Sequence, residues 1–292
     1  MTTLRDHPLF LLLSTGILLG LYFPVGKLGA SAGIDPLVWA LVISLVPGLL
    51  LATASWVEDR RAVQLPHLGF ALVSGLLAYV IPNALTFAAL PHVGSGYMSL
   101  MFAFSPVVTA AVSMLAGVRP PSGQLLLGVG FGFAGAALIA LSRNAFALEE
   151  QGHWLWLAFL VPVSLGFGNV FRTARWPQGM APLRMAAVTN LVAVIPLVLL
   201  LVLWGREGAV VQALQSPGLL LLQAAISAAM FTVFFRLQWV GGPTYLSQIG
   251  YVAAAVGLLA GVGFLGERYP PLVWAGAAAI AAGVVVSNWR RI

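Results

Sequence analysis

The sequence predicts an all-α integral membrane protein with ten transmembrane helices, formed by two inverted five-helix repeats. Three observations carry this prediction: an apolar composition, a series of apolar segments of membrane-spanning length, and an internal repeat of those segments. Of the 292 residues, 60% are hydrophobic and 8% are charged, and the mean hydropathy is +0.98. Since about a quarter of the residues in a soluble domain are charged, lipid is the expected main solvent of this chain.

The apolar segments have the length that a transmembrane helix needs. About 20 predominantly apolar residues cross about 30 Å of hydrocarbon as an α-helix. The segments are 8–29, 36–56, 67–89, 94–117, 123–141, 154–174, 182–204, 217–239, 244–265 and 272–289. They leave no room for a soluble domain. The first is long enough to span and lacks a small-residue cleavage site before Asp35, so we expect a retained helix and not a signal peptide.

The basic residues predict how these spans are oriented. With ten spans, both termini lie on the same side as the loops that follow even-numbered spans. Ten of the 14 Lys and Arg residues fall on that side, namely Arg5, Arg60, Arg61, Arg119, Arg172, Arg175, Arg184, Arg236, Arg290 and Arg291. The other four are Lys27, Arg143, Arg206 and Arg268. By the positive-inside rule, we expect a multi-pass inner (cytoplasmic) membrane protein with both termini cytoplasmic.

Composition also excludes several kinds of partner and cofactor. The sequence pI of about 10.3 would suggest nucleic acid in a soluble protein, but the basic residues are scattered between apolar segments, and no basic patch is interleaved with aromatics. No cysteine is present, which removes thiol catalysis and cysteine-ligated metals. The four histidines share no metal-ligand spacing. We therefore expect no nucleic-acid partner, no metal and no cofactor.

The two halves of the chain resemble each other. Leu19, Gly20, Phe23 and Lys27 match Phe167, Gly168, Phe171 and Arg175 at an offset of 148, and Pro47 matches Pro196 at 149. Five spans per repeat is an odd number, so the second copy enters the membrane upside down. The sequence therefore predicts a first repeat over 1–148 and an inverted second repeat over 149–292, the architecture on which alternating access is built.

Several short motifs give the chain a family resemblance. The first span carries Gly20-Leu21-Tyr22-Phe23-Pro24-Val25-Gly26-Lys27, span nine ends in Leu265-Gly266-Glu267, and the last span is glycine-rich from Gly276 to Gly283. In a duplicated ten-helix chain, these motifs resemble the EamA branch of the drug/metabolite transporter superfamily. The resemblance implies a cavity surrounded by spans three, four, eight and nine, with five and ten packed together. One departure is Val118, which follows Gly117 where the family usually has glutamate.

Polar side chains follow one face of four spans. Span four carries Ser95, Ser99, Phe102, Pro106, Thr109 and Ser113 at steps of three and four, span eight carries Gln223, Ser227, Phe231, Phe234 and Gln238, span nine carries Thr244, Gln248 and Tyr251, and span three carries Tyr79 and Asn83. This spacing places each set on one side of a helix. These are the spans that the resemblance places around the cavity. The alternative is that the hydroxyls bond to their own backbone or to a neighbouring helix.

We expect the substrate to be bound by polar and aromatic side chains at mid-depth and at the two mouths. The candidates are Tyr22, Lys27, Tyr79, Asn83, Ser99, Phe102, Asn169, Gln238, Gln248 and Tyr251. Lys27 and its repeat partner Arg175 form an inverted pair of cations that would suit an anionic group, unless Lys27 extends to lipid headgroups and Arg175 only fixes the topology. In spans five and ten, glycines at helical spacing predict close helix packing.

The resemblance implies a transporter of small organic metabolites, an exporter or facilitator of amino acids or related zwitterions that works by alternating access. Two other classes stay open. An intramembrane lipid-processing enzyme would need acid–base groups, but no span holds a carboxylate at depth. The second class is a non-transporting assembly or sensor subunit, which the sequence supports with no soluble output domain. We therefore expect no enzymatic activity, with a small-molecule substrate and the lipid bilayer as partners, and a monomer or weak homodimer.

Overall fold

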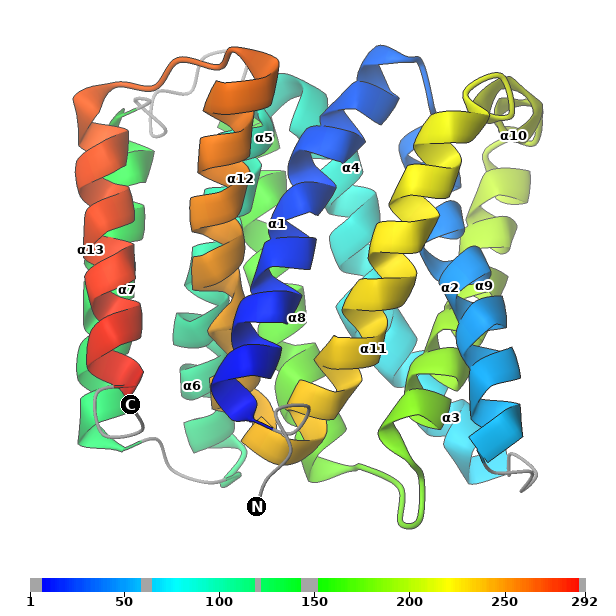
Figure 1. The fold of residues 1–292 in the computed structure, drawn as a ribbon, viewed down its shortest axis with the longest axis horizontal. Coiled ribbons are helices and arrows are strands. Elements are labelled where there is room, and N and C mark those ends of the chain that lie inside the picture. The colour runs from blue at the N-terminus through cyan, green and yellow to red at the C-terminus, as the bar shows by residue number, and fades with distance from the viewer. Residues whose placement is uncertain (1–6, 59–64, 119–121, 143–151, 289–292) are drawn as a thin grey trace.

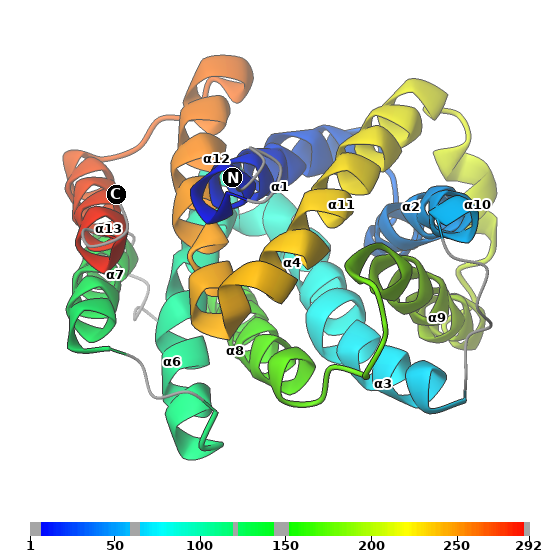
Figure 2. The same ribbon diagram turned by 60° about the horizontal axis from the view of Figure 1, so that its bottom comes forward.

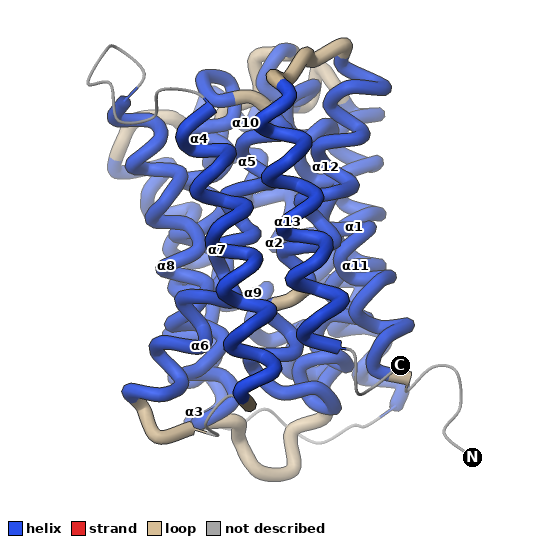
Figure 3. The backbone as a smooth tube through the Cα atoms, turned by 90° about the vertical axis from the view of Figure 1, so that its left-hand side faces the viewer, coloured by secondary structure: helices blue, strands red, loops and turns tan. Residues whose placement is uncertain are grey.

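Every regular element in the described part of the chain is helical. The computed structural model describes residues 7–58, 65–118, 122–142 and 152–288. The helices stand side by side, and their ends gather on two opposite sides (Figure 1, Figure 3). The first helix begins and the last helix ends on the same side, the lower one in Figure 1. We call this the terminal side and the opposite one the far side.

The membrane-length helical stretches alternate in direction between these two sides, and two of them are each divided into several helical elements (Figure 1). In chain order the helical elements are α1 (Pro8–Ser31), α2 (Pro36–Glu58), α3 (Leu65–Gly75), a π-helical turn (Leu76–Val80), α4 (Ile81–Val93), α5 (Ser95–Met101), a 3-10 turn (Phe102–Phe104), α6 (Ser105–Leu115), α7 (Gly123–Ser142), α8 (Gly152–Ala174), α9 (Pro182–Leu203), α10 (Gly208–Ala213), α11 (Pro217–Ser247), α12 (Ile249–Leu265) and α13 (Pro271–Asn288).

Seven helical stretches within the described residues are long and apolar enough to cross a membrane. They are Pro8–Ser31, Pro36–Val57, His67–Val93, Ser95–Leu115, His153–Ala174, Pro182–Leu203 and Pro217–Pro243. Three shorter apolar helices, Leu126–Gly135, Ile249–Leu265 and Pro271–Gly283, coincide with predicted spans five, nine and ten. The structure thus confirms a helical, multi-pass membrane protein, and the count of ten spans stays a prediction.

Helices from the first half of the chain pack mainly against helices from the second half. α1 lies against α11 and α12, while α8 lies against α4 and α6. α2 packs against α9, and α7 packs against α13 at the periphery (Figure 2). The space at the centre of the molecule is therefore bounded by both halves.

Glycines permit the close approach of α7 and α13. A Cβ on Gly135 would collide with the backbone carbonyl of Gly276, and one on Gly283 would collide with the carbonyl of Gly128. The small-residue faces predicted for spans five and ten thus lie in this contact, where they let two backbones touch.

Two helices depart from regular α geometry at the centre of the molecule. The π-helical turn contains Tyr79 and is followed by Pro82, and the 3-10 turn begins at Phe102 and is followed by Pro106. Proline has no N–H to donate to the preceding turn, so it disturbs the hydrogen-bond ladder at both places. Ser164 of α8 donates to the carbonyl oxygen of Leu77 at 2.6 Å, as expected for irregular backbone within a membrane.

Candidate functional site

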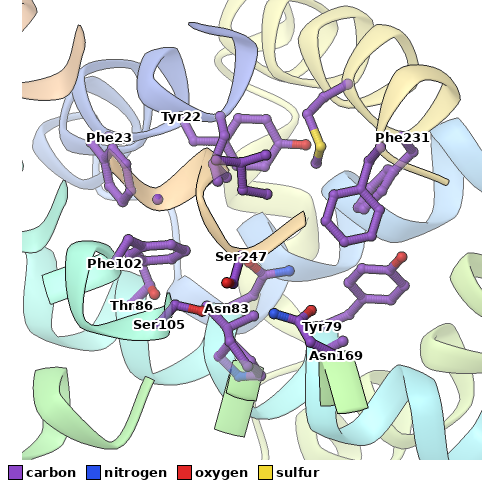
Figure 4. Close-up of a pocket in the computed structure, with 18 of the residues that line it drawn as sticks. Tyr22, Phe23, Tyr79, Asn83, Thr86, Phe102, Ser105, Asn169, Phe231 and Ser247 are labelled. Carbon is purple, nitrogen blue, oxygen red and sulfur yellow. The ribbon is translucent and has the colours of Figure 1, made fainter. Parts of the chain in front are cut away.

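A cavity lies between the two halves, where α1, α4, α8, α11 and α12 approach one another (Figure 4). Its empty volume is about 700 Å³, a figure that includes space open to solvent. The lining residues are Leu19, Tyr22, Phe23, Ala78, Tyr79, Pro82, Asn83, Thr86, Phe87, Phe102, Ser105, Leu165, Asn169, Met230, Phe231, Phe234, Ser247, Ile249 and Gly250. None of them is charged.

Aromatic rings form two walls of this cavity. Phe23 and Phe102 meet edge to face with ring centroids 5.0 Å apart, and Tyr79 meets Phe231 in the same way at 4.8 Å. Phe23 of α1 and Phe102 both belong to the first half, whereas Tyr79 of the first half meets Phe231 of α11 in the second half. The irregular turns described above carry Tyr79 and Phe102, so the helix distortions place one ring in each wall. Such rings offer flat apolar surfaces to a ligand.

The polar atoms of the cavity are few. Figure 4 shows Asn83 and Asn169 between the two aromatic pairs. The hydroxyls of Tyr79 and Thr86 are buried and have no hydrogen-bond partner within the described part of the chain. Since buried polar groups are nearly always bonded, these hydroxyls are suited to a ligand or to water.

Arg172 lies directly behind this cavity, fully buried with an exposed fraction of 0%. Its Nη2 donates to Asn169 Oδ1 at 2.6 Å and its Nε donates to Gln238 Oε1 at 3.2 Å. The guanidinium carbon lies 5.1 Å from the ring centroid of Phe234. Counting Arg172 as a charge of a cytoplasmic loop was therefore wrong. It falls inside α8, and its spacing of three residues from Asn169 was the available signal.

A second hollow opens beyond Arg172 toward the terminal side. It is lined by Val118, Thr173, Trp176, Gln238, Trp239, Val240 and Gly242. Gln238 Nε2 donates to Thr173 Oγ1 at 2.7 Å. A polar chain therefore runs from Asn169 in the cavity through Arg172 to Gln238 and Thr173 in this hollow.

On the far side, a hydrogen-bonded cluster around Glu267 joins the two halves. Its carboxylate accepts from Lys27 and Tyr269, from the Ser95 backbone N–H at 3.1 Å and hydroxyl at 2.7 Å, and from the Gly96 N–H at 3.3 Å. Lys27 ends α1, Ser95 begins α5 and Glu267 follows α12. We call Lys27, Ser95, Gly96, Glu267 and Tyr269 the far-side cluster.

The far-side cluster keeps Glu267 ionised. Burial raises the pKa of its carboxyl, but the hydrogen bonds from Lys27, Tyr269 and Ser95 outweigh burial and lower the pKa to about 2. Burial and the bond with Glu267 together raise the pKa of the Tyr269 hydroxyl. The hydrogen bonds of the cluster therefore favour the ionised form of Glu267, which accepts them.

The structure brings half of the predicted site residues together. Tyr22, Tyr79, Asn83, Phe102 and Asn169 line the central cavity. The other five predicted site residues lie outside this cavity, namely Lys27, Ser99, Gln238, Gln248 and Tyr251.

Two of the residues outside the cavity, Ser99 and Tyr251, serve helix contacts. Ser99 donates to the carbonyls of Gly96 and Ala254 at the contact between α5 and α12, and Tyr251 reaches Gly132 of α7. Gln248 is buried but does not line the cavity. Lys27 belongs to the far-side cluster and Gln238 to the second hollow. Sequence reasoning missed Arg172 and three polar lining residues, Thr86, Ser105 and Ser247.

Comparison with known proteins separates family from fold. Residues 8–141 match the model of the EamA-like transporter family. This part of the chain belongs to the EamA-like transporter family. The EamA match confirms, for residues 8–141, the family resemblance that the motifs predicted. No curated protein matches the chain.

Solved structures support the fold beyond the residues that the family model matches. One, described as "Crystal structure of protein", covers 98% of this chain and 98% of its own, with a TM-score of 0.66 and 14% sequence identity. At this identity the likeness shows the fold alone. It extends over both halves of the molecule.

Proposed function

We propose that this protein transports small organic metabolites by alternating access, with the central cavity as its substrate site. One observation carries the proposal: the cavity is lined by helices from both halves, and each half packs mainly on the other. If one half rocks against the other, this shared space opens alternately to the two sides. The uncharged, largely aromatic lining suits a small organic body.

The proposal includes ten spans in two inverted repeats, 1–148 and 149–292. Positive φ angles occur at Gly33 and Gly179, at Gly94 and Gly242, and at Gly117 and Gly266. These pairs have offsets of 146, 148 and 149 residues, close to the offsets of 148 and 149 in the sequence repeat. The packing is also reciprocal, because α1 contacts α11 and α12 while α8 contacts α4 and α6.

We propose that the far-side cluster is the closed gate of this state. It links the first half through Lys27 and Ser95 to the second half through Glu267. The equivalent position on the terminal side is Val118, which lines the second hollow and cannot accept a hydrogen bond through its side chain. Arg175, the repeat partner of Lys27, is exposed. Among the described residues, the two repeat-equivalent positions can therefore form this ion pair on the far side, and their counterparts Val118 and Arg175 do not form it on the terminal side.

The substrates we favour are amino acids or related zwitterions with an aromatic or bulky apolar side chain, moved by export or facilitated diffusion. The rings of the cavity would pack against the side chain, while the amides of Asn83 and Asn169 would bind polar groups. Since no acidic residue lines the cavity and Glu267 keeps its charge, we propose that no carboxylate of the pathway cycles protons. The basic-residue count supports our proposal that the terminal side faces the cytoplasm across an inner membrane.

The proposal is tested by flux into proteoliposomes that contain the purified protein and a mixture of labelled metabolites. We expect saturable uptake of zwitterionic or carboxylate-bearing metabolites, absent from protein-free vesicles and driven by their own gradients. An imposed pH gradient, with the membrane potential clamped, should not concentrate them. Absence of uptake for every metabolite class, or the appearance of lipid-turnover products, would contradict a transport function.

A further inference from the structure

Arg172 carries a buried positive charge for which no described residue supplies a counter-ion. Within the described residues, ion pairs join Lys27 to Glu267 and Arg206 to Asp35, both on the far side. The partners of Arg172 are two neutral amides, and its Nη1 is buried with no hydrogen-bond partner among the described residues. Buried charges are normally paired and hydrogen-bonded. The missing partner is therefore an anion from outside the described chain.

The surroundings of Arg172 indicate where that anion would come from. Asn169 and Phe234 both contact the guanidinium, and both line the central cavity. The Tyr79 hydroxyl, also without a partner, lies at the same end of the cavity as Asn169 (Figure 4). A ligand that displaces the amide of Asn169 meets the guanidinium directly.

We propose that Arg172 binds the carboxylate of the substrate, whose apolar body packs between the aromatic walls of the cavity. This inference rests on the proposed function and narrows its substrate class. A guanidinium binds a carboxylate through parallel hydrogen bonds. A doubly charged phosphate would keep one charge unpaired, because no lining residue is charged. An ammonium group would meet only ring faces and neutral oxygens, so the carboxylate is the group that the site selects.

A purely structural role for Arg172 makes a different prediction. In that case the guanidinium only holds α8 against α11 through Gln238, and ligands would not sense its charge. Asn169→Asp separates the two roles, because it places a carboxylate 2.6 Å from Nη2 where the amide oxygen now lies. The new carboxylate would neutralise Arg172. If Arg172 binds the ligand, this would weaken ligand binding; if Arg172 only bridges two helices, it would strengthen that bridge.

The test uses three compounds with the same ring and chain: L-phenylalanine, 3-phenylpropanoate and 2-phenylethylamine. Equilibrium binding to the purified full-length protein should be detected for the two carboxylates and not for the amine. Arg172→Gln and Asn169→Asp should each weaken carboxylate binding by at least about tenfold, as loss of a charged hydrogen bond implies. Arg172→Lys should retain part of the affinity, because it keeps the charge and loses the paired donors.

A matched control is Arg206→Gln. Arg206 also donates to a side chain and lies over an aromatic ring, Trp204 at 5.9 Å, but it is half exposed on the far side. This variant should bind both carboxylates as the wild type does. Thermal unfolding would show whether each variant folds, and Asn169→Asp should raise the midpoint of unfolding because it pairs a buried charge.

The inference is overturned if the wild type binds neither carboxylate, if it binds the amine equally well, or if folded Asn169→Asp keeps full affinity. Failure of the two proposals can be distinguished. If Arg172→Gln does not change metabolite flux, Arg172 does not bind the substrate carboxylate, but the protein is still a transporter. If the protein binds carboxylates but shows no flux, the role of Arg172 is supported and the proposed transport function is contradicted.

Discussion

Glu267→Ala should open the far side of the protein. The substitution removes the acceptor of the far-side cluster, and the Ser95 backbone N–H and hydroxyl then lose their partner. Ser95 has an exposed fraction of 0%, whereas Lys27 can turn to water. Each buried group left unsatisfied costs about 1–3 kcal/mol. Two groups at the lower end give about 2 kcal/mol, which corresponds to roughly a thirtyfold change in an equilibrium constant.

Cysteine labelling measures this opening, because the chain contains no natural cysteine. Thr86→Cys places a thiol in the cavity. An impermeant maleimide added from the far side should label it slowly in the parent protein, and at least about tenfold faster when Glu267→Ala is added. Asp35→Ala is the control, since it breaks the far-side pair with Arg206, which lies over the contact between α2 and α9. Unchanged labelling in a folded Glu267→Ala protein, or equal acceleration by Asp35→Ala, would refute the gate.

Three further predictions concern stability and orientation. The lowered pKa of Glu267 contributes stability that is present above about pH 4.5, the ordinary pKa of a glutamate, and is lost as the pH falls toward about 2. Thermal unfolding of the wild type and of Glu267→Gln should therefore differ at pH 6 and converge toward pH 2. A constant difference would contradict the lowered pKa. Gly135→Ala should destabilise the α7–α13 contact by about 1–3 kcal/mol. The control Gly130→Ala, whose Cβ would meet nothing within 4 Å, should be neutral or slightly stabilising. Equal unfolding midpoints for the two variants would argue against the α7–α13 contact. On whole cells, an impermeant maleimide should label Ala147→Cys and not Ser122→Cys, and the reverse pattern would invert the proposed orientation.

The sequence predicted the helices well because membrane-spanning length and apolar composition are local properties. Predicted span three, 67–89, lies within the stretch His67–Val93, and predicted span six, 154–174, lies within His153–Ala174. Hydropathy cannot show that a span is interrupted, so the π-helical turn at Tyr79 was not expected. Pro82 and Pro106 marked where such irregularities occur but not which kind forms.

The candidate site was predicted only in part because helical spacing defines a face and not its neighbour. Tyr79 and Asn83 lie on a face that meets the cavity. Ser99 and Tyr251 also lie on polar faces, but those faces meet other helices at this depth. Arg172 was assigned to a loop because the positive-inside rule treats arginine near a span end as a topological charge, whereas its burial depends on how α8 packs against α11.

Blocking the cavity while leaving the helices intact tests the central claim most directly. Thr86→Trp would fill the cavity from α4, and Thr232→Trp would place the same ring on the exposed face of α11. With both variants purified and reconstituted in proteoliposomes at equal protein density, metabolite uptake should be abolished by Thr86→Trp and retained by Thr232→Trp. Equal uptake by both folded variants would contradict the claim that substrates pass through the space between the two halves.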